Sequence, residues 1–179
     1  MASNPILRST RLFLFLLVAL FICPSESRRV QQITTMSFYL QDLASGRNAT
    51  VVPVTGISGK NWSFTTFGTI FVMDDLITET PDRNSNQVGR AQGILVASAL
   101  DGSNVHAQLS FVFSNFNYTG STLELQGASR QFERYKEISV VSGTGAFRFA
   151  KGYAIFETIY YDPRISYSII RCNVNLLPS

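Results

Sequence analysis

The segment from Val140 to Tyr161, VVSGTGAFRFAKGYAIFETIYY, constrains the fold of this 179-residue chain more than any other segment. A glycine-bearing turn at 142–145 opens it, and a long run of aromatic and β-branched residues follows. Apolar residues occupy both parities of this run, and Gly152 lies near its centre. A strand with two apolar faces is typical of a closed barrel whose outer wall also contacts another subunit.

Eight segments have the composition and spacing of β-strands, and the chain has almost no helix signals. They are residues 35–43, 66–74, 87–100, 104–114, 121–126, 136–141, 147–161 and 165–175. The clearest is 104–114, where apolar and polar residues alternate, and the Asp101-Gly102-Ser103-Asn104 stretch before it predicts a hairpin. An antiparallel meander removes its exposed edges by closing on itself. We therefore expect an all-β fold, an eight-stranded antiparallel β-barrel whose interior admits one small ligand.

Residues 1–27 have the organisation of a secretory signal peptide. Arg8 and Arg11 precede the apolar run 12–22, and a polar stretch at 24–27 follows. Eleven apolar residues are too few to span a bilayer as a stable helix, although an N-terminal membrane anchor is the alternative. The sequence therefore predicts a secreted, extracellular protein.

Residues 28–179 are expected to form one domain, since no linker or internal repeat divides them. Loss of the leader leaves 13 basic and 11 acidic side chains, a net charge of +2. So weak a charge argues against nucleic acid as the partner.

Three N-glycosylation sequons begin at Asn48, Asn61 and Asn117, all in predicted turns. Behind a signal peptide, they predict glycan attachment at one or more of these sites. Cys23 leaves with the leader unless cleavage precedes it, so Cys172 is expected to be an unpaired, buried strand residue.

Four blocks resemble the plant dirigent family. In the family's order, they are FYLQDL at 38–43, FGTIFVMDDLITETP at 67–81, VGRAQGILVAS at 88–98 and VVSGTGAFRFAKGYAIFET at 140–158. The resemblance implies a barrel of the dirigent and allene-oxide-cyclase-like type, assembled into a homotrimer or, alternatively, a dimer. Many members have a cysteine before the first strand that could bridge to one near the C-terminus, and residues 31–37 lack it.

Asp42 is the candidate catalytic residue. It shares one parity of the first strand with Met36, Phe38 and Leu40, so its carboxylate meets the cavity if that apolar row faces inward. A carboxylate beside apolar walls is a candidate acid or base. The alternative is a strand-end cap on the turn at 44–46. The family resemblance favours the catalytic role, because an aspartate at the matching place is associated with the substrate pocket.

The same resemblance makes Ser129 and Lys136 candidate substrate-binding residues. Dirigent proteins that guide pinoresinol formation typically have an aspartate and an arginine at these two places. Serine does not ionise as an acid, and lysine is a mobile point charge where arginine is a planar fork. The departures put pinoresinol formation in doubt, although Arg130 or Arg134 could replace the missing arginine.

Asp74 and Asp75 occupy successive positions, so only one of them can point into the cavity. Paired carboxylates suggest acid/base chemistry, but a solvated turn at a strand end is the preferred interpretation. Arg90 and Arg148 are interpreted as partners of structural ion pairs. The acids considered for these pairs are Glu133, Glu137 and Glu157.

The sequence suggests no cofactor. His106 is the only histidine and lies opposite the apolar row of its strand, and no metal-ligand cluster, phosphate loop or dinucleotide fingerprint is present. The chain therefore has no evident means to oxidise a phenol. The chain is therefore expected to act on a radical or reactive intermediate that another protein makes, or to perform acid/base chemistry only.

By resemblance, the chain is predicted to set the stereochemistry of phenoxy-radical coupling of monolignols such as coniferyl alcohol in lignan biosynthesis. A laccase or peroxidase would supply the radicals. Two alternatives stay open. One is a cofactor-free dehydratase or cyclase that acts through a quinone methide, as pterocarpan synthases do, and the other is a protein of lignin organisation or defence in the cell wall.

Overall fold

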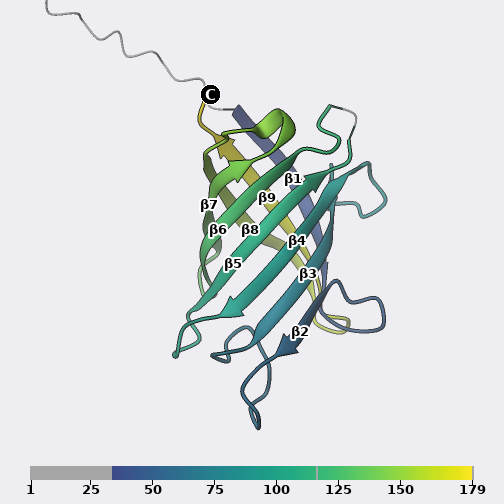
Figure 1. The fold of residues 1–179 in the computed structure, drawn as a ribbon. Coiled ribbons are helices and arrows are strands. Elements are labelled where there is room, and N and C mark those ends of the chain that lie inside the picture. Colours follow the sequence, from purple (N-terminus) through teal and green to yellow (C-terminus); the bar gives the residue numbers. More distant parts are fainter. Residues whose placement is uncertain (1–33, 116, 179) are drawn as a thin grey trace, which may run out of the picture. The chain divides into compact units, whose positions relative to one another are not determined.

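The computed structural model describes residues 34–115 and 117–178, and the predicted leader at 1–27 lies outside these ranges. The described chain is almost entirely β-structure (Figure 1). The strands are β1 (Thr34–Leu43), β2 (Val51–Thr55), β3 (Ile70–Thr78), β4 (Gln87–Ala97), β5 (Asn104–Phe113), β6 (Thr122–Arg130), β7 (Tyr135–Gly143), β8 (Gly152–Asp162) and β9 (Tyr167–Leu176). A single 3₁₀ turn, η1 (Gly145–Phe147), is described between β7 and β8. No helix in the described ranges is long and apolar enough to cross a membrane.

Eight strands close into an antiparallel barrel, as the sequence predicts. Neighbouring strands follow the order β1-β9-β8-β7-β6-β5-β4-β3, and β1 closes the circle by pairing with β3. The short β2 pairs with the first half of β3, whereas β1 pairs with its second half. The neighbour of β3 therefore changes near Asp75.

The core lies inside the barrel and follows the alternation of each strand. In β5, Val105, Ala107, Leu109, Phe111 and Phe113 are buried. His106 alternates with this row and is only partly buried, as expected for the outer face. The Phe38 ring meets Phe111 edge-on, with 5.4 Å between centroids, which joins β1 to β5 across the barrel.

The strand predicted over 147–161 begins only at Gly152, so the first part of that prediction is wrong. Residues 145–147 instead form η1, where Gly145 has a φ of 58° and the Phe147 side chain turns inward. Gly152 is required where β8 meets β9, because a Cβ at this position would lie 1.9 Å from the Asn175 carbonyl oxygen.

The strand predicted over 66–74 is shifted in the structure to 70–78. Thr66 and Thr69 belong to turns, in which the Thr69 amide donates to the Thr66 carbonyl at 3.2 Å. Residues 76–78 pair with both β1 and β4, which extends the strand past its two aspartates. The short β2 has no counterpart in the sequence prediction.

Cys172 and the three sequons lie where the sequence suggests. Cys172 is fully buried on β9, between Phe38 of β1 and Phe156 of β8. Asn48, Asn61 and Asn117 are exposed in the loops that precede β2, β3 and β6. The structure thus leaves all three asparagines accessible to solvent.

Candidate functional site

A cavity of about 230 Å³ lies in one half of the barrel. Its lining comes mainly from the later residues of β1, β4, β6 and β8 and the early residues of β3, β5, β7 and β9. At the opposite end, Phe113, Tyr118 and Phe147 pack against one another with ring centroids 4.9 to 6.0 Å apart. The aromatic cluster and the cavity therefore occupy different ends of the same interior.

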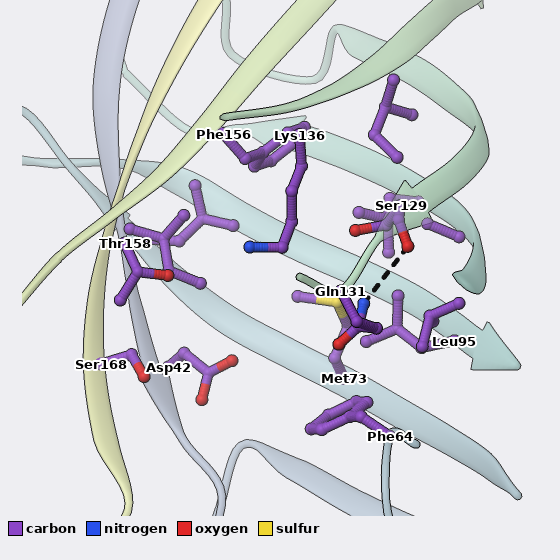
Figure 2. A pocket seen from close by; sticks show the side chains of 16 residues that line it. Asp42, Phe64, Met73, Leu95, Ser129, Gln131, Lys136, Phe156, Thr158 and Ser168 are labelled. Atoms are coloured by element: carbon purple, nitrogen blue, oxygen red, sulfur yellow. Dashed lines mark hydrogen bonds between the residues drawn. The ribbon is translucent and has the colours of Figure 1, made fainter. Parts of the chain in front are cut away.

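The cavity wall is mainly apolar, with polar groups on several strands. The apolar residues are Leu40, Phe64, Met73, Leu95, Val105, Ala107, Leu109, Ile138, Phe156 and Ile170. The polar residues are Asp42, Ser129, Gln131, Lys136, Thr158 and Ser168. Figure 2 shows the polar groups distributed around the space between the labelled apolar side chains. Such a wall suits a small, largely apolar molecule with polar ends.

Asp42 points into this cavity from β1. It shares the inner parity of the buried Phe38 and Leu40, and in the β1–β9 ladder it lies opposite Ser168. Burial beside apolar walls raises the pKa of the Asp42 carboxyl from 3.8 to about 6. A substantial fraction of Asp42 is therefore protonated in the mildly acidic range.

The alternative role of Asp42 as a cap of the turn at 44–46 finds no support in the described hydrogen bonds. The Ala44 amide donates to the Ser166 carbonyl at 2.9 Å, and the Ser45 hydroxyl donates to the Ile165 carbonyl at 2.8 Å. The turn is thus held by the β8–β9 hairpin, and the Asp42 carboxylate stays with the cavity.

Lys136 and Ser129 line the same cavity as Asp42. Lys136 lies opposite Phe156 in the β7–β8 ladder, and its ammonium extends into the space (Figure 2). The Lys136 Nζ donates to the Glu133 carbonyl at 3.2 Å, and the Ser129 carbonyl accepts from Gln131 Nε2 at 3.3 Å. The structure therefore brings the three predicted site residues to one cavity.

Arg130 and Arg134 do not take the place of the arginine that the family pattern contains. Arg130 pairs with Glu133 at 2.9 Å, and Arg134 pairs with Glu157 at 2.8 Å. Neither side chain lines the cavity. Lys136 is thus the cation of the described cavity wall.

The interpretation of Asp74 and Asp75 as a solvated turn is wrong, because both lie within β3. Asp75 is fully buried and shares the inner parity of Met73 and Ile77. Burial, with a smaller contribution from the Asp42 charge, raises the pKa of the Asp75 carboxyl from 3.8 to about 7. Asp74 faces the other way, so the prediction that only one of the two points inward is correct.

The ion pairs of the outer wall differ from those expected. Arg90 pairs with Asp74 across β3 and β4 at 2.5 Å, because the two residues are diagonal neighbours on the outer face of the β3–β4 ladder. Glu157 is bound by Arg134 and Arg171, and the hydrogen bonds from Arg134 and Arg171, together with their charges, lower its pKa. Arg148 is exposed and takes part in none of the ion pairs found among the described residues.

Several residues that line the cavity could not be identified from the sequence. Thr158 and Ser168 have the inner parity of Phe156 and Ile170, which the register between β8 and β9 would have shown. Gln131 and Phe64 lie outside the strands, and no local pattern marks them. Within the described ranges, no three of the His, Cys, Asp and Glu side chains are grouped as metal ligands.

The described residues form a closed antiparallel barrel with a mainly apolar cavity and an interior carboxylate, which is the architecture of a small-molecule-binding barrel. The family model described as "Dirigent-like protein" matches residues 33–177. This chain therefore belongs to the dirigent family.

Individual relatives cover most of the chain. It is 37% identical over 152 residues to Dirigent protein 23 of Arabidopsis thaliana, covering 85% of this chain and 81% of that protein. It is 34% identical over 127 residues to pterocarpan synthase 1 of Glycine max, covering 70% and 68% of the two chains. The solved structure of a pterocarpan synthase dirigent protein superposes with a TM-score of 0.75 at 30% identity, covering 83% of this chain and 86% of that one.

Proposed function

We propose that this protein binds a phenylpropanoid-derived intermediate in its barrel and sets the stereochemistry of the bond that forms there. The first candidate reaction is the coupling of phenoxy radicals of a monolignol such as coniferyl alcohol. A separate laccase or peroxidase removes one electron and one proton from each phenol. The observation that supports the proposal is the cavity itself, in which Asp42, Lys136 and an apolar wall surround one small space.

The barrel contributes positioning. Apolar side chains such as Phe156 and Met73 hold the planar body of the ligand, and Lys136 and Ser129 donate hydrogen bonds to its oxygens. Holding one reactive face in a fixed geometry lowers the barrier to one stereoisomer relative to the other. A difference of about 1.4 kcal/mol is already a tenfold selectivity.

Asp42 acts after the coupling in this scheme. Two radicals join through a new carbon–carbon bond, and the product is a bis-quinone methide. A hydroxyl of the coupled ligand then attacks the quinone methide. Its proton passes to the Asp42 carboxylate, and the quinone-methide oxygen takes up a proton to become a phenol. Asp42 serves as a base, and its apolar surroundings raise its basicity.

The second candidate is a cofactor-free dehydrating cyclisation, and two observations favour it. A cavity of about 230 Å³ suits one ligand better than two, and the raised pKa of Asp42 keeps an acid proton available. In this reaction Asp42 protonates a hydroxyl, which leaves as water while a phenol conjugated to that carbon releases its proton to solvent, and a quinone methide forms. A second phenol of the ligand then closes the ring and returns its proton to Asp42, and the quinone-methide oxygen takes a proton back from solvent, so the net change is the loss of one water. Similarity to pterocarpan synthases supports this candidate.

Secretion to the cell wall, glycosylation at the exposed Asn48, Asn61 and Asn117, and assembly into a homotrimer belong to the same proposal. In this proposal, the oxidases that the coupling reaction requires act in the same compartment. A role in lignin organisation or defence would follow from the same location.

Two incubations test the candidates. Coniferyl alcohol with laccase, with and without the purified protein, is analysed by chiral chromatography, and a hydroxy-isoflavan is incubated without any oxidase. Enantiomeric excess in the first supports guided coupling, and ring closure in the second supports cyclisation. Racemic products across several phenols together with no cyclisation would overturn the proposed function.

A further inference from the structure

A second carboxylate lies beside Asp42 inside the barrel. In the β1–β3 ladder Leu40 pairs with Ile77 and Gln41 pairs with Leu76. The same register, continued by one residue, sets Asp42 opposite Asp75. Both residues have the inner parity of their strands, so their carboxyl groups face the same side of the seam.

Asp75 forms no salt bridge with any cation of the described residues. It is fully buried, and one carboxylate oxygen accepts a hydrogen bond from the Thr50 hydroxyl at 2.6 Å. The other oxygen, Oδ2, is buried without a hydrogen-bond partner among the described residues. A buried carboxylate with an unsatisfied oxygen is costly in its charged form, which favours a bound proton.

Thr50 connects Asp75 to Leu43, the residue that follows Asp42. Its hydroxyl accepts a hydrogen bond from the Leu43 amide at 3.0 Å while it donates to Asp75. The Thr50 amide donates to the Leu43 carbonyl, and the Asp74 amide donates to the Thr50 carbonyl, each at 2.8 Å. The segment after Asp42 is thus fixed to β3 at the point where the neighbour of β3 changes from β1 to β2.

The other charges near the pair come from β3, β4 and β7. Asp74 and Arg90 lie on the outer face and bind each other, and they act on Asp75 in opposite directions. Lys136 faces the cavity from β7 and bonds to the Glu133 carbonyl. No described cation pairs with either interior carboxylate.

We propose that Asp75 is a positioning residue that shares one proton with Asp42, so that the two interior carboxylates titrate as one pair. Two carboxylates that face each other in an apolar site do not readily ionise together. Asp75 therefore sets the protonation state of Asp42, which in turn contacts the ligand. The functional meaning of this pair rests on the proposed role of Asp42 as an acid or base.

The direct test measures titration without any ligand. Carboxyl resonances of Asp42 are followed by ¹³C NMR from pH 3 to pH 9, in the wild type and in Asp75→Asn. Asparagine keeps the acceptor for Thr50 and removes the charge, so the two-step titration curve that a coupled Asp42 shows in the wild type should become a single step. The matched control is Asp74→Asn, which removes the neighbouring acid of the outer face and should leave the two-step curve nearly unchanged. A titration curve of Asp42 that is the same in Asp75→Asn and in the wild type would overturn the proposal.

A reciprocal measurement keeps the proposal testable if Asp75→Asn does not fold. In Asp42→Asn, the midpoint of Asp75 should fall, because the Asp42 charge no longer opposes ionisation of Asp75. Thr50→Val provides a third measurement. Loss of the donor to Asp75 moves the shared proton toward Asp75, so the first step of the Asp42 titration should move to lower pH. An Asp75 midpoint that is the same in the wild type and in Asp42→Asn would overturn the proposal.

These titrations are independent of the proposed reactions. If Asp42 and Asp75 titrate as a pair but the protein neither directs radical coupling nor closes a ring, the shared proton stands and the proposed function is rejected. If the protein controls stereochemistry but Asp42 and Asp75 titrate independently, the proposed function stands and the shared proton is rejected.

Discussion

Asp42 on β1 lies directly opposite Ser168 on β9, and both side chains line the cavity. This cross-strand pair forms part of the polar wall, whereas Phe111, the largest of the fully buried side chains, does not line the cavity. The residues proposed for chemistry are therefore distinct from several that dominate packing. Conservative substitutions at Asp42 should change the reaction more than the stability.

Asp42→Asn should abolish stereochemical control or slow ring closure by about 10²- to 10⁴-fold, the usual range for loss of a general acid or base. Product analysis by chiral chromatography measures the effect, and circular dichroism verifies the fold. Asp101→Asn, at an exposed turn position, is the control and should behave as the wild type. Unchanged product ratios in Asp42→Asn would exclude Asp42 from the site.

The pH profile separates the two candidate reactions. Because the pKa of Asp42 is about 6, its acid form predominates below that pH and its base form above. Dehydration requires the acid, so its rate should fall as the pH rises through about 6. Control of radical coupling requires the base, so enantiomeric excess should rise over the same range. Initial rates and product ratios between pH 4.5 and 8 give the answer, and a profile without any inflection in this range would contradict both schemes.

Asp75 should also make stability depend on pH. Its folded-state pKa is about 7 against 3.8, so the folded protein binds the proton more strongly than the unfolded chain. The contribution is fully present below about pH 4 and is lost as the pH rises through about 7. Urea unfolding at several pH values should therefore show a smaller loss of stability over this range in Asp75→Asn than in the wild type. If the free energy of unfolding depends on pH in the same way in both proteins, Asp75 is not the source of this pH dependence.

Lys136→Met should weaken the binding of a phenolate-like ligand by roughly ten- to a hundredfold, because a hydrogen bond to a charged group contributes about 1.5 to 3 kcal/mol. Methionine keeps the apolar stem against Phe156 and removes the cation. Fluorescence or calorimetric titration measures the dissociation constant. Lys151→Met, at an exposed position before β8, is the matched control. Equal affinities in the two variants would place the Lys136 ammonium outside the binding contacts.

The barrel could be predicted because period-two alternation is a local signal that the closed sheet also requires. The inner row of β5 and the inward direction of Asp42 both follow from parity within a single strand. The resemblance to the family added Ser129 and Lys136, whose common cavity depends on the register between strands.

The prediction of a turn at Asp75 is wrong because paired acids after an apolar run favour a turn locally, and pairing of residues 76–78 with β1 and β4 overrides that preference. The prediction of a strand over 147–151 is wrong for the opposite reason. Its composition favours a strand, but the 3₁₀ turn at η1 places Phe147 against the aromatic cluster and leaves Phe149 exposed with a φ of 66°. Both errors come from contacts between distant parts of the chain.

Blocking the cavity tests the central claim most directly. Ser129 lines the cavity, whereas its neighbour Ala128 is exposed. Tryptophan at position 129 should therefore fill the cavity, and tryptophan at position 128 should add the same bulk to the exposed side of β6. Enantiomeric excess or ring closure, whichever the wild type gives, is measured for Ser129→Trp and Ala128→Trp after circular dichroism verifies both folds. We expect Ala128→Trp to match the wild type and Ser129→Trp to give racemic product or no ring closure. Full stereochemical control by Ser129→Trp would contradict a reaction inside the barrel.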